Sequence, residues 1–161
     1  MILAITGHRP NKLGGYDPNP TSKQVQKAIE RALLLLKPDK LITGMALGVD
    51  QWAAALCIRH SIPFIAAVPC MEHEIKWNDK SQELYFRLLN KAEEVVVVTQ
   101  TPYNSKVMQK RNVWMVDHAD TLLAVWDGSK SGTANCIASA RKQGKKLYRI
   151  TPGDDLLKGM P

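Results

Sequence analysis

Short apolar segments alternate with amphipathic helical segments along the whole chain, and this alternation limits the available folds more than any other feature. The apolar segments are mostly continuous runs, which is typical of parallel strands buried on both faces. The expected strands are residues 2–6, 40–43, 63–68, 94–99, 121–125 and 146–150. The run Val95–Val98 is the clearest of them, because four successive β-branched residues disfavour a helix.

Helical patterns fill the intervals between these runs. The expected helices are residues 21–36, 50–59, 81–92, 105–119 and 132–143. The first begins at a Thr-Ser pair suited to an N-cap, Asp50 is well placed to cap the second, and Gly144 is a natural end for the last. The pattern predicts an α/β fold, namely a single Rossmann-like domain of three layers with a mainly parallel sheet of about six strands.

The chain is long enough for one domain with its own core, and it contains no internal repeat or interdomain linker. We therefore expect a single domain over residues 1–161, with a loosely held tail after residue 150. No run of about 18 apolar residues predicts a membrane span, and no signal peptide is evident. Three widely spaced cysteines form neither a disulfide framework nor a metal pair. We expect a cytoplasmic protein without a metal ion or cofactor.

Small, polar and basic residues gather in the loops that follow the expected strands, whereas the opposite connections are plain turns. Ligands of open α/β sheets bind at the carboxyl ends of the strands, so these loops predict a binding site. The candidate ligand-binding residues in the loops are Gly7, His8, Arg9, Gly44, Gly48, Asp50, Asp127, Gly128, Ser131, Gly132 and Thr133.

Residues 128–133 form a glycine-serine turn that leads into the last helix. Free backbone N–H groups at a helix N-terminus attract anions, and the hydroxyls of Ser131 and Thr133 and the charge of Lys130 would add to a phosphate site. The alternative is a tight turn with a simple cap. Residues 44–50 are a second glycine-containing turn between a strand and a helix. Gly48 in this turn allows either the approach of a ligand or close packing of the helix. Neither segment has the spacing of a dinucleotide-binding motif or a P-loop.

Several side chains outside these turns are also candidates. Arg9 can grip a phosphate or carboxylate with its planar guanidinium, and His8 is a base, a donor or a structural partner of the loop. Arg111 and Asn112 either reach the same pocket or lie on a solvated helix face. The candidates for stacking on a base are Trp77 and Tyr103, with core packing as the alternative for Trp77. Cys136 has no evident base nearby in the sequence and is expected to be a packing residue.

Taken together, these motifs resemble the SLOG superfamily, which includes the DNA-processing protein DprA and the LONELY GUY phosphoribohydrolases, and they are most similar to its YpsA-like branch. The stretches that carry the resemblance are Thr6–Pro10, Thr43–Asp50, Trp77 with Ser81, Gln82 and Tyr85, Arg111–Asn112 with Met115–Asp117, and Ala124–Gly128 leading to Gly132–Thr133. The resemblance implies a Rossmann-like fold with a nucleotide-type pocket at the strand ends.

Two of the stretches resemble particular members of the superfamily. Residues 44–50 look like the glycine loop of DprA, which binds single-stranded DNA, and Gly132–Thr133 looks like the phosphate loop of LONELY GUY enzymes. That loop continues Gly-Thr-x-x-Glu with a catalytic glutamate, where this chain has Cys136. Asp117, Asp127 or Glu72 could take the place of this glutamate, and the spacing of the sequence singles out none of them.

Three functions follow from these observations. The first is binding of a nucleotide or nucleotide-derived phosphate ligand, as a sensor or sequestering factor. The second is hydrolysis of the N-glycosidic bond of a nucleoside monophosphate, and the third is binding of single-stranded DNA as in DprA. The net charge of +7, from 22 basic and 15 acidic residues, suits all three, although solubility alone also explains it. Exposed apolar helix faces would allow two copies to pair.

Overall fold

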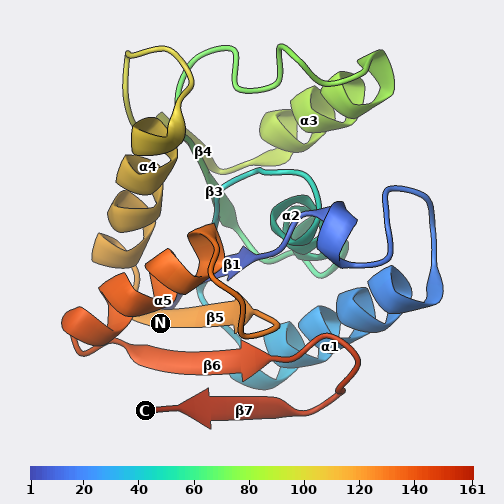
Figure 1. The fold of residues 1–161 in the computed structure, drawn as a ribbon, viewed down its shortest axis with the longest axis vertical. Coiled ribbons are helices and arrows are strands. Elements are labelled where there is room, and N and C mark those ends of the chain that lie inside the picture. The colour runs from blue at the N-terminus through green and yellow to red at the C-terminus, as the bar shows by residue number, and fades with distance from the viewer.

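One open sheet of seven strands, flanked by five α-helices, makes up the computed structural model, which describes residues 1–161 (Figure 1). The strands are β1 (Ile2–Gly7), β2 (Lys40–Thr43), β3 (Phe64–Val68), β4 (Glu94–Val97), β5 (Thr121–Val125), β6 (Lys146–Ile150) and β7 (Leu157–Met160). The helices are α1 (Pro20–Leu36), α2 (Val49–Arg59), α3 (Asp79–Lys91), α4 (Ser105–Asp117) and α5 (Gly132–Lys142). The expected α/β class is confirmed.

The strand order across the sheet is β4-β3-β2-β1-β5-β6-β7, which places β1 at the centre. Strands β1 to β6 are parallel, and β7 pairs antiparallel with β6. From β1 the chain adds β2, β3 and β4 on one side and then returns through α4 to place β5 on the other side. The direction of winding therefore reverses between β1 and β5, and a crevice for a ligand is expected at the carboxyl ends of these two strands.

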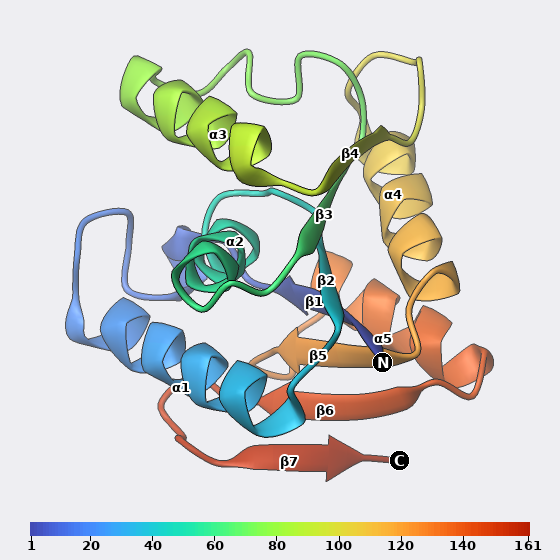
Figure 2. The same cartoon turned by 180° about the vertical axis from the view of Figure 1, so that it is seen from behind.

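Helices α1, α2 and α3 cover one face of the sheet, and α4 and α5 cover the other (Figures 1 and 2). A core of 23 buried residues lies on the side of α1 to α3, and a core of 12 lies on the side of α4 and α5. The apolar stripe expected on α1 is confirmed, because Val25, Ile29 and Leu33 are fully buried. None of the helices combines the length and apolar character needed to span a bilayer.

Two helices begin differently from the expectation. Asn19, rather than the Thr-Ser pair, caps α1: its Oδ1 accepts a hydrogen bond from the Ser22 N–H (2.9 Å), and Ser22 Oγ accepts one from the Asn19 N–H (3.3 Å). This reciprocal capping box tolerates Pro20 at the first helical position, where an N–H has no helical partner. The cap of α2 is Gly48, and Asp50 lies in its first turn instead. Gly144 follows the C-cap of α5 with a φ of 66°, as expected.

The run Val95–Val98 does not lie in a strand buried on both faces, as its composition predicts. β4 is an edge strand, and the Val95 side chain is 44% exposed. A continuous apolar run indicates a strand, but its position in the sheet depends on the order of the other strands, which the run does not encode. The strand also ends at Val97, two residues earlier than expected.

The tail after residue 150 is held in place, which corrects the expectation of a loose tail. Its strand β7 pairs with β6 in the register Leu147↔Met160 to Ile150↔Leu157. The Gln24 side chain of α1 accepts a hydrogen bond from the Gly153 N–H (2.9 Å) and donates one to the Asp154 carbonyl (3.1 Å). Pro152 and Gly153 therefore lie in a turn between two strands.

Candidate ligand-binding site

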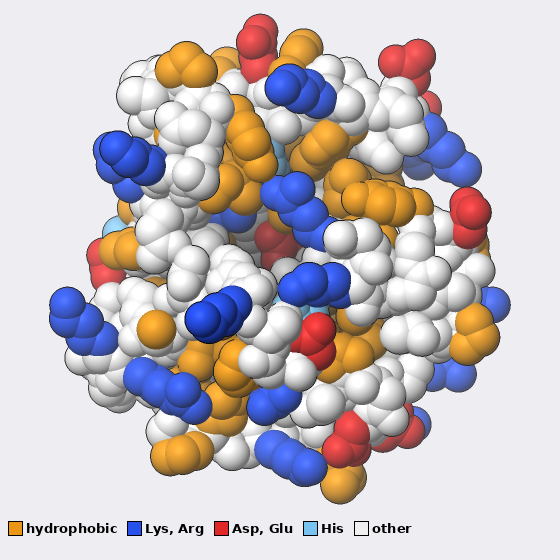
Figure 3. Space-filling view, in the orientation of Figure 1, with side chains coloured by type: hydrophobic (Ala, Val, Ile, Leu, Met, Phe, Trp, Pro, Cys, Tyr) orange, Lys and Arg blue, Asp and Glu red, His pale blue; other side chains and the backbone are white.

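A cavity of about 560 Å³ lies at the carboxyl end of β1, at the point where the winding of the sheet reverses. Its volume is in the range of about 300–1,000 Å³ that is usual for small-molecule sites. The lining residues are Ile5, Thr6, Gly7, His8, Arg9, Asn11, Lys12, Ala46, Asp50, Tyr103, Ser105, Met108, Gln109, Arg111, Asn112, Met115, Ser131, Gly132, Thr133 and Asn135. Figure 3 shows a hollow on this face with Lys and Arg side chains around it and an acidic side chain at its floor.

Most of the candidate residues from the sequence lie together in this cavity. Those that line it are Gly7, His8, Arg9, Asp50, Tyr103, Arg111, Asn112, Ser131, Gly132 and Thr133. Those that do not are Gly44, Gly48, Trp77, Asp127 and Gly128.

The first turn of α5 forms one wall. Ser131 caps the helix, because its Oγ accepts a hydrogen bond from the Ala134 N–H (3.3 Å). The N–H groups of Gly132 and Thr133 precede the first i→i−4 bond of the helix, so they have no helical partner. A Cβ built on Gly132 would meet only Asn112 Nδ2, at 3.8 Å, so the approach to these N–H groups is open. This wall favours an anion.

Basic side chains from the loop after β1 form the adjoining wall. Arg9 is exposed, and its Nη2 donates a hydrogen bond to the Tyr103 hydroxyl (3.3 Å). Lys12 Nζ donates to Ser129 Oγ (2.9 Å), so Lys12 ties this loop to the turn before α5. Lys130, the cation expected from the sequence, is exposed and does not line the cavity. Arg9 and Lys12 therefore supply the solvent-accessible positive charge at the site.

His8 is held by the loop after β5. Its Nε2 accepts a hydrogen bond from the Asp127 N–H (3.0 Å), so a neutral imidazole carries its proton on Nδ1. The Asp127 Oδ1 lies at the same distance from Nε2 but already accepts the Ser129 N–H (2.8 Å). Burial lowers the pKa of His8, and the hydrogen bonds from Ser129 lower the pKa of Asp127 to about 2. This geometry favours the structural role for His8 over that of a base.

A buried arginine and a buried carboxylate form the floor. Arg111 is 3% exposed; its Nη1 donates to the carbonyls of Gly44 and Ala67, and its Nε donates to Asn112 Oδ1 (2.9 Å). The alternative of a solvated helix face is therefore wrong for Arg111. Burial lowers the pKa of Arg111, and the negative charge of Asp50 acts in the opposite direction by raising it.

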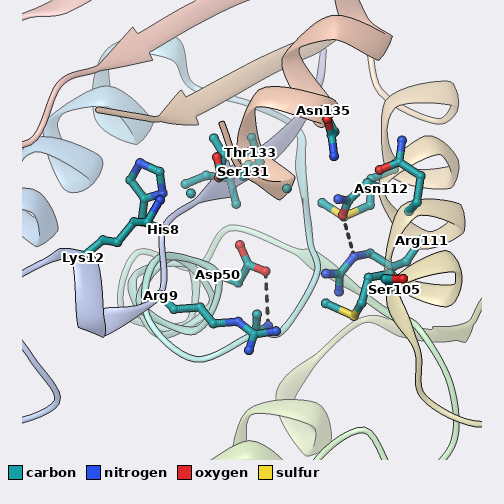
Figure 4. Close-up of a pocket in the computed structure, with 18 of the residues that line it drawn as sticks. His8, Arg9, Lys12, Asp50, Ser105, Arg111, Asn112, Ser131, Thr133 and Asn135 are labelled. Carbon is teal, nitrogen blue, oxygen red and sulfur yellow. Dashed lines mark hydrogen bonds between the residues drawn. The ribbon is translucent and has the colours of Figure 1, made fainter. Parts of the chain in front are cut away.

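Asp50 accepts a hydrogen bond from the Ala46 N–H (3.2 Å) and is the one acidic residue among those that line the cavity. Burial raises the pKa of Asp50 to about 6, against the opposing charges of Arg111 and Arg9. In Figure 4 the Asp50 carboxylate lies between the side chains of these two arginines. The site thus combines several fixed donors with a single ionisable acceptor.

Two glycines of the loop after β2 serve packing. Gly48 has a φ of 93°, and a Cβ there would lie 2.8 Å from the His8 carbonyl oxygen. Of its two alternatives, close helix packing is the one that the contacts support. A Cβ on Gly44 would lie 2.5 Å from Arg111 Nη1, so Gly44 leaves room for the buried guanidinium.

The two stacking candidates lie in different places. Trp77 packs in an aromatic cluster with His73 (ring centroids 5.0 Å apart) and Tyr85 (5.3 Å) and does not line the cavity. Tyr103, from the loop between β4 and α4, lines the cavity and is 49% exposed. Only Tyr103 is therefore placed to stack on a bound ring.

Sequence reasoning found Arg111 and Asn112 of α4 but missed the other residues of the wall that this helix forms. Ser105, Met108 and Gln109 of α4 line the cavity together with Asn112. Their spacing of i, i+3, i+4 and i+7 is that of one helix face, and this signal was available in the sequence. Cys136 is fully buried in the core on the side of α4 and α5, where burial raises its pKa to about 12, consistent with the expected packing role.

Sequence comparisons place the chain among bacterial relatives. The model of the YspA SLOG family matches residues 3–152. The uncharacterized SPbeta prophage-derived protein YoqJ of Bacillus subtilis (strain 168) is 36% identical over 157 residues, covering 83% of this chain and 91% of YoqJ. A UPF0398 protein of Bacillus cereus (strain B4264) is 31% identical over 155 residues, covering 89% of this chain and 84% of that protein.

Solved structures of low sequence identity share the fold. DNA processing protein A (DprA) from Streptococcus pneumoniae gives a TM-score of 0.67 at 16% identity, over 92% of this chain and 49% of that chain. DprA from Helicobacter pylori gives 0.66 at 21% identity, over 92% and 64%. The molybdenum cofactor binding protein from Rippkaea orientalis gives 0.60 at 18% identity, over 93% and 76%. This chain spans about half the length of the S. pneumoniae protein.

The matched residues 3–152 include every element from β1 to β6, apart from Ile2 at the start of β1, and every residue that lines the cavity. The resemblance to the SLOG superfamily and its YpsA-like branch is therefore confirmed. The chain belongs to the YspA SLOG family.

Proposed function

We propose that this protein binds a nucleotide or nucleotide-derived phosphate ligand in the cavity at the carboxyl end of β1. One observation carries the proposal: the open N-terminus of α5, the cations Arg9 and Lys12, and the half-exposed ring of Tyr103 face a single cavity of about 560 Å³. The helix N-terminus and the two cations suit a phosphate, and the ring of Tyr103 suits a planar base.

The charges of the cavity favour a ligand with an anionic group and at least one hydrogen-bond donor. The N–H groups of Gly132 and Thr133 and the cations of the loop after β1 suit phosphate oxygens. The Asp50 carboxylate suits a hydroxyl or amino group, such as those of a ribose or a base. Two structural neighbours are described as binding single-stranded DNA and a molybdenum cofactor, which supports a ligand-binding use of this fold.

Binding of the ligand without its conversion, as in a sensor or sequestering factor, needs nothing beyond these groups.

A second function, hydrolysis of an N-glycosidic bond, is favoured by one observation. Asp50 supplies a buried carboxylate inside the cavity, although Cys136 replaces the glutamate after the Gly-Thr turn. A carboxylate of this kind stabilises positive charge on a ribosyl carbon. Release of free base from a nucleoside monophosphate by the wild type, and not by Asp50→Asn, would identify this activity.

The binding site is tested by Arg9→Ala and Gly132→Asp, with AMP and ADP-ribose as probes in equilibrium titrations. Both positions are exposed, so the variants should fold, and each should weaken binding at least tenfold. Arg9→Ala removes a charge-assisted contact, and Gly132→Asp places a negative charge where the phosphate would lie.

Gly132→Ala and Arg87→Ala are the matched controls. The first adds an uncharged methyl group whose nearest neighbour is Asn112 Nδ2 at 3.8 Å, and the second removes an exposed arginine of α3 that does not line the cavity. Arg87→Ala should bind like the wild type, and Gly132→Ala should bind more tightly than Gly132→Asp because it adds no negative charge. Unchanged binding by folded Arg9→Ala and Gly132→Asp would refute the site.

A further inference from the structure

His73 lies in the loop between β3 and α3 and is 5% exposed. It is the centre of the aromatic cluster: its ring centroid is 5.0 Å from that of Trp77, 5.9 Å from that of Tyr85 and 6.0 Å from that of Tyr103. The contacts with Trp77 and Tyr85 are edge-to-face, whereas the planes of His73 and Tyr103 are only 15° apart. His73 therefore connects the buried residues of α3 to the wall of the cavity.

Tyr103 is supported at two points. One face of its ring stacks on His73, and its hydroxyl accepts the hydrogen bond from Arg9. Half of the side chain nevertheless stays exposed and lines the cavity. A tyrosine on a loop would ordinarily sample several rotamers, and each support reduces that freedom. The remaining ring face is thereby held in a fixed orientation before any ligand arrives.

The surroundings keep His73 uncharged. Burial, with the charges of Arg111 and Arg9, lowers the pKa of His73 to about 3, and Glu74, Cys70 and Tyr85 are the other titratable groups in this cluster. His73 Nδ1 is buried without a hydrogen-bond partner. An unpaired buried nitrogen contributes nothing favourable to stability, so a phenyl ring would serve the packing at least as well. What the position requires is a flat ring.

We propose that His73 is a positioning residue that holds Tyr103 as a platform on which a planar aromatic ring of the ligand stacks. This inference rests on the proposed function and specifies it: the ligand carries a base or a comparable flat heterocycle in addition to its phosphate. Stacking on an aromatic side chain is tolerant of the identity of the base, because every base presents a π-face. The platform thus selects for a flat ring and not for one particular base.

The test compares AMP with ribose 5-phosphate, which carries the phosphate and sugar but no base. In equilibrium titrations His73→Ala should weaken AMP binding about tenfold or more, the usual effect of losing one base–aromatic stack, and change ribose 5-phosphate binding by less than about twofold. His73→Phe should restore AMP binding, because it keeps the flat ring. Tyr103→Ala, at an exposed position, should reproduce the His73→Ala pattern even if His73→Ala folds poorly.

Equal losses for both probes would show a general structural role and overturn the inference, as would a His73→Phe variant that binds AMP no better than His73→Ala. Unchanged AMP binding by Tyr103→Ala would overturn it as well. If the wild type binds AMP and ribose 5-phosphate equally, the platform is refuted while the proposed function stands. If the wild type binds neither AMP nor ribose 5-phosphate, the platform is refuted, and binding of ADP-ribose or another nucleotide decides the proposed function.

Discussion

At the scale of single residues, Asp50 gives the cavity a charge that depends on pH. It lies in the first turn of α2, where the helix N-terminus favours a negative charge, yet burial dominates and raises its pKa to about 6. Arg111 opposes this shift by its charge, but its Nη1 donates hydrogen bonds to backbone carbonyls and not to Asp50. The cavity therefore contains a carboxyl group that changes its charge just below neutral pH.

Substitution of Asp50 by Asn should change the pH dependence of stability. Because the folded state holds the proton more tightly than the unfolded state, wild-type stability should fall relative to Asp50→Asn as the pH rises from about 4 to about 6, and then stay level. The full difference would be up to about 3 kcal/mol, from a pKa that moves from 3.8 to about 6. Denaturant unfolding of both proteins between about pH 2 and 8 measures it.

Asp127→Asn is the control with the opposite sign. The pKa of Asp127 is lowered to about 2, so wild-type stability should rise relative to this variant as the pH increases from about 2 to about 4. A stability difference between wild type and Asp50→Asn that does not vary with pH would contradict the account of the cavity floor.

At the scale of elements, the start of α2 determines how closely that helix approaches β1. A Cβ on Gly7 would lie 2.6 Å from Val49 Cγ1, and one on Gly48 would lie 2.8 Å from the His8 carbonyl oxygen. The absence of side chains at both glycines lets the first turn of α2 contact the end of β1. This contact brings Asp50 into the same cavity as His8 and Arg9.

Gly48→Ala should destabilise the protein more than Gly144→Ala. Both glycines have positive φ angles, 93° and 66°, but a Cβ at Gly144 meets nothing within 4 Å, whereas one at Gly48 meets backbone. Backbone strain alone costs about 1–3 kcal/mol, and the contact with His8 adds to it for Gly48→Ala. Denaturant midpoints of the two variants give the comparison. Equal losses of stability would show that the close approach of α2 is unimportant.

The sequence predicts most of the helices and strands, but it misses one short strand and misplaces the start of one helix. All six apolar runs are strands, because β-branched and apolar residues favour buried extended chain wherever the strand lies. β7 was missed because the segment 157–160 is short and mixed in polarity, and only pairing with β6 makes it a strand. The cap of α1 was misplaced because Asn19 and Pro20 give a stronger start signal than the following Thr-Ser pair.

At the scale of the whole molecule, the position of the cavity follows from the strand order. The sequence indicates which loops share one edge of the sheet, and ten of its candidate residues line a single cavity there. It does not indicate that β5 lies beside β1, since no local pattern encodes which strands pair. The sequence does show that Ser105, Met108, Gln109 and Asn112 share one face of α4, but it does not show that this face lines the cavity, because the packing of α4 beside α5 is a tertiary contact.

The central claim is that this cavity holds a nucleotide-type phosphate ligand. Thermal unfolding of the wild type with mononucleotides, dinucleotides, ADP-ribose, cyclic nucleotides and short single-stranded DNA, each in low and high salt, tests it most directly. A small nucleotide at about 100 times its dissociation constant should add about 2.7 kcal/mol of stability, with only a modest effect of salt. Stabilisation by DNA alone, lost at high salt, or no stabilisation by any of these compounds would contradict the claim.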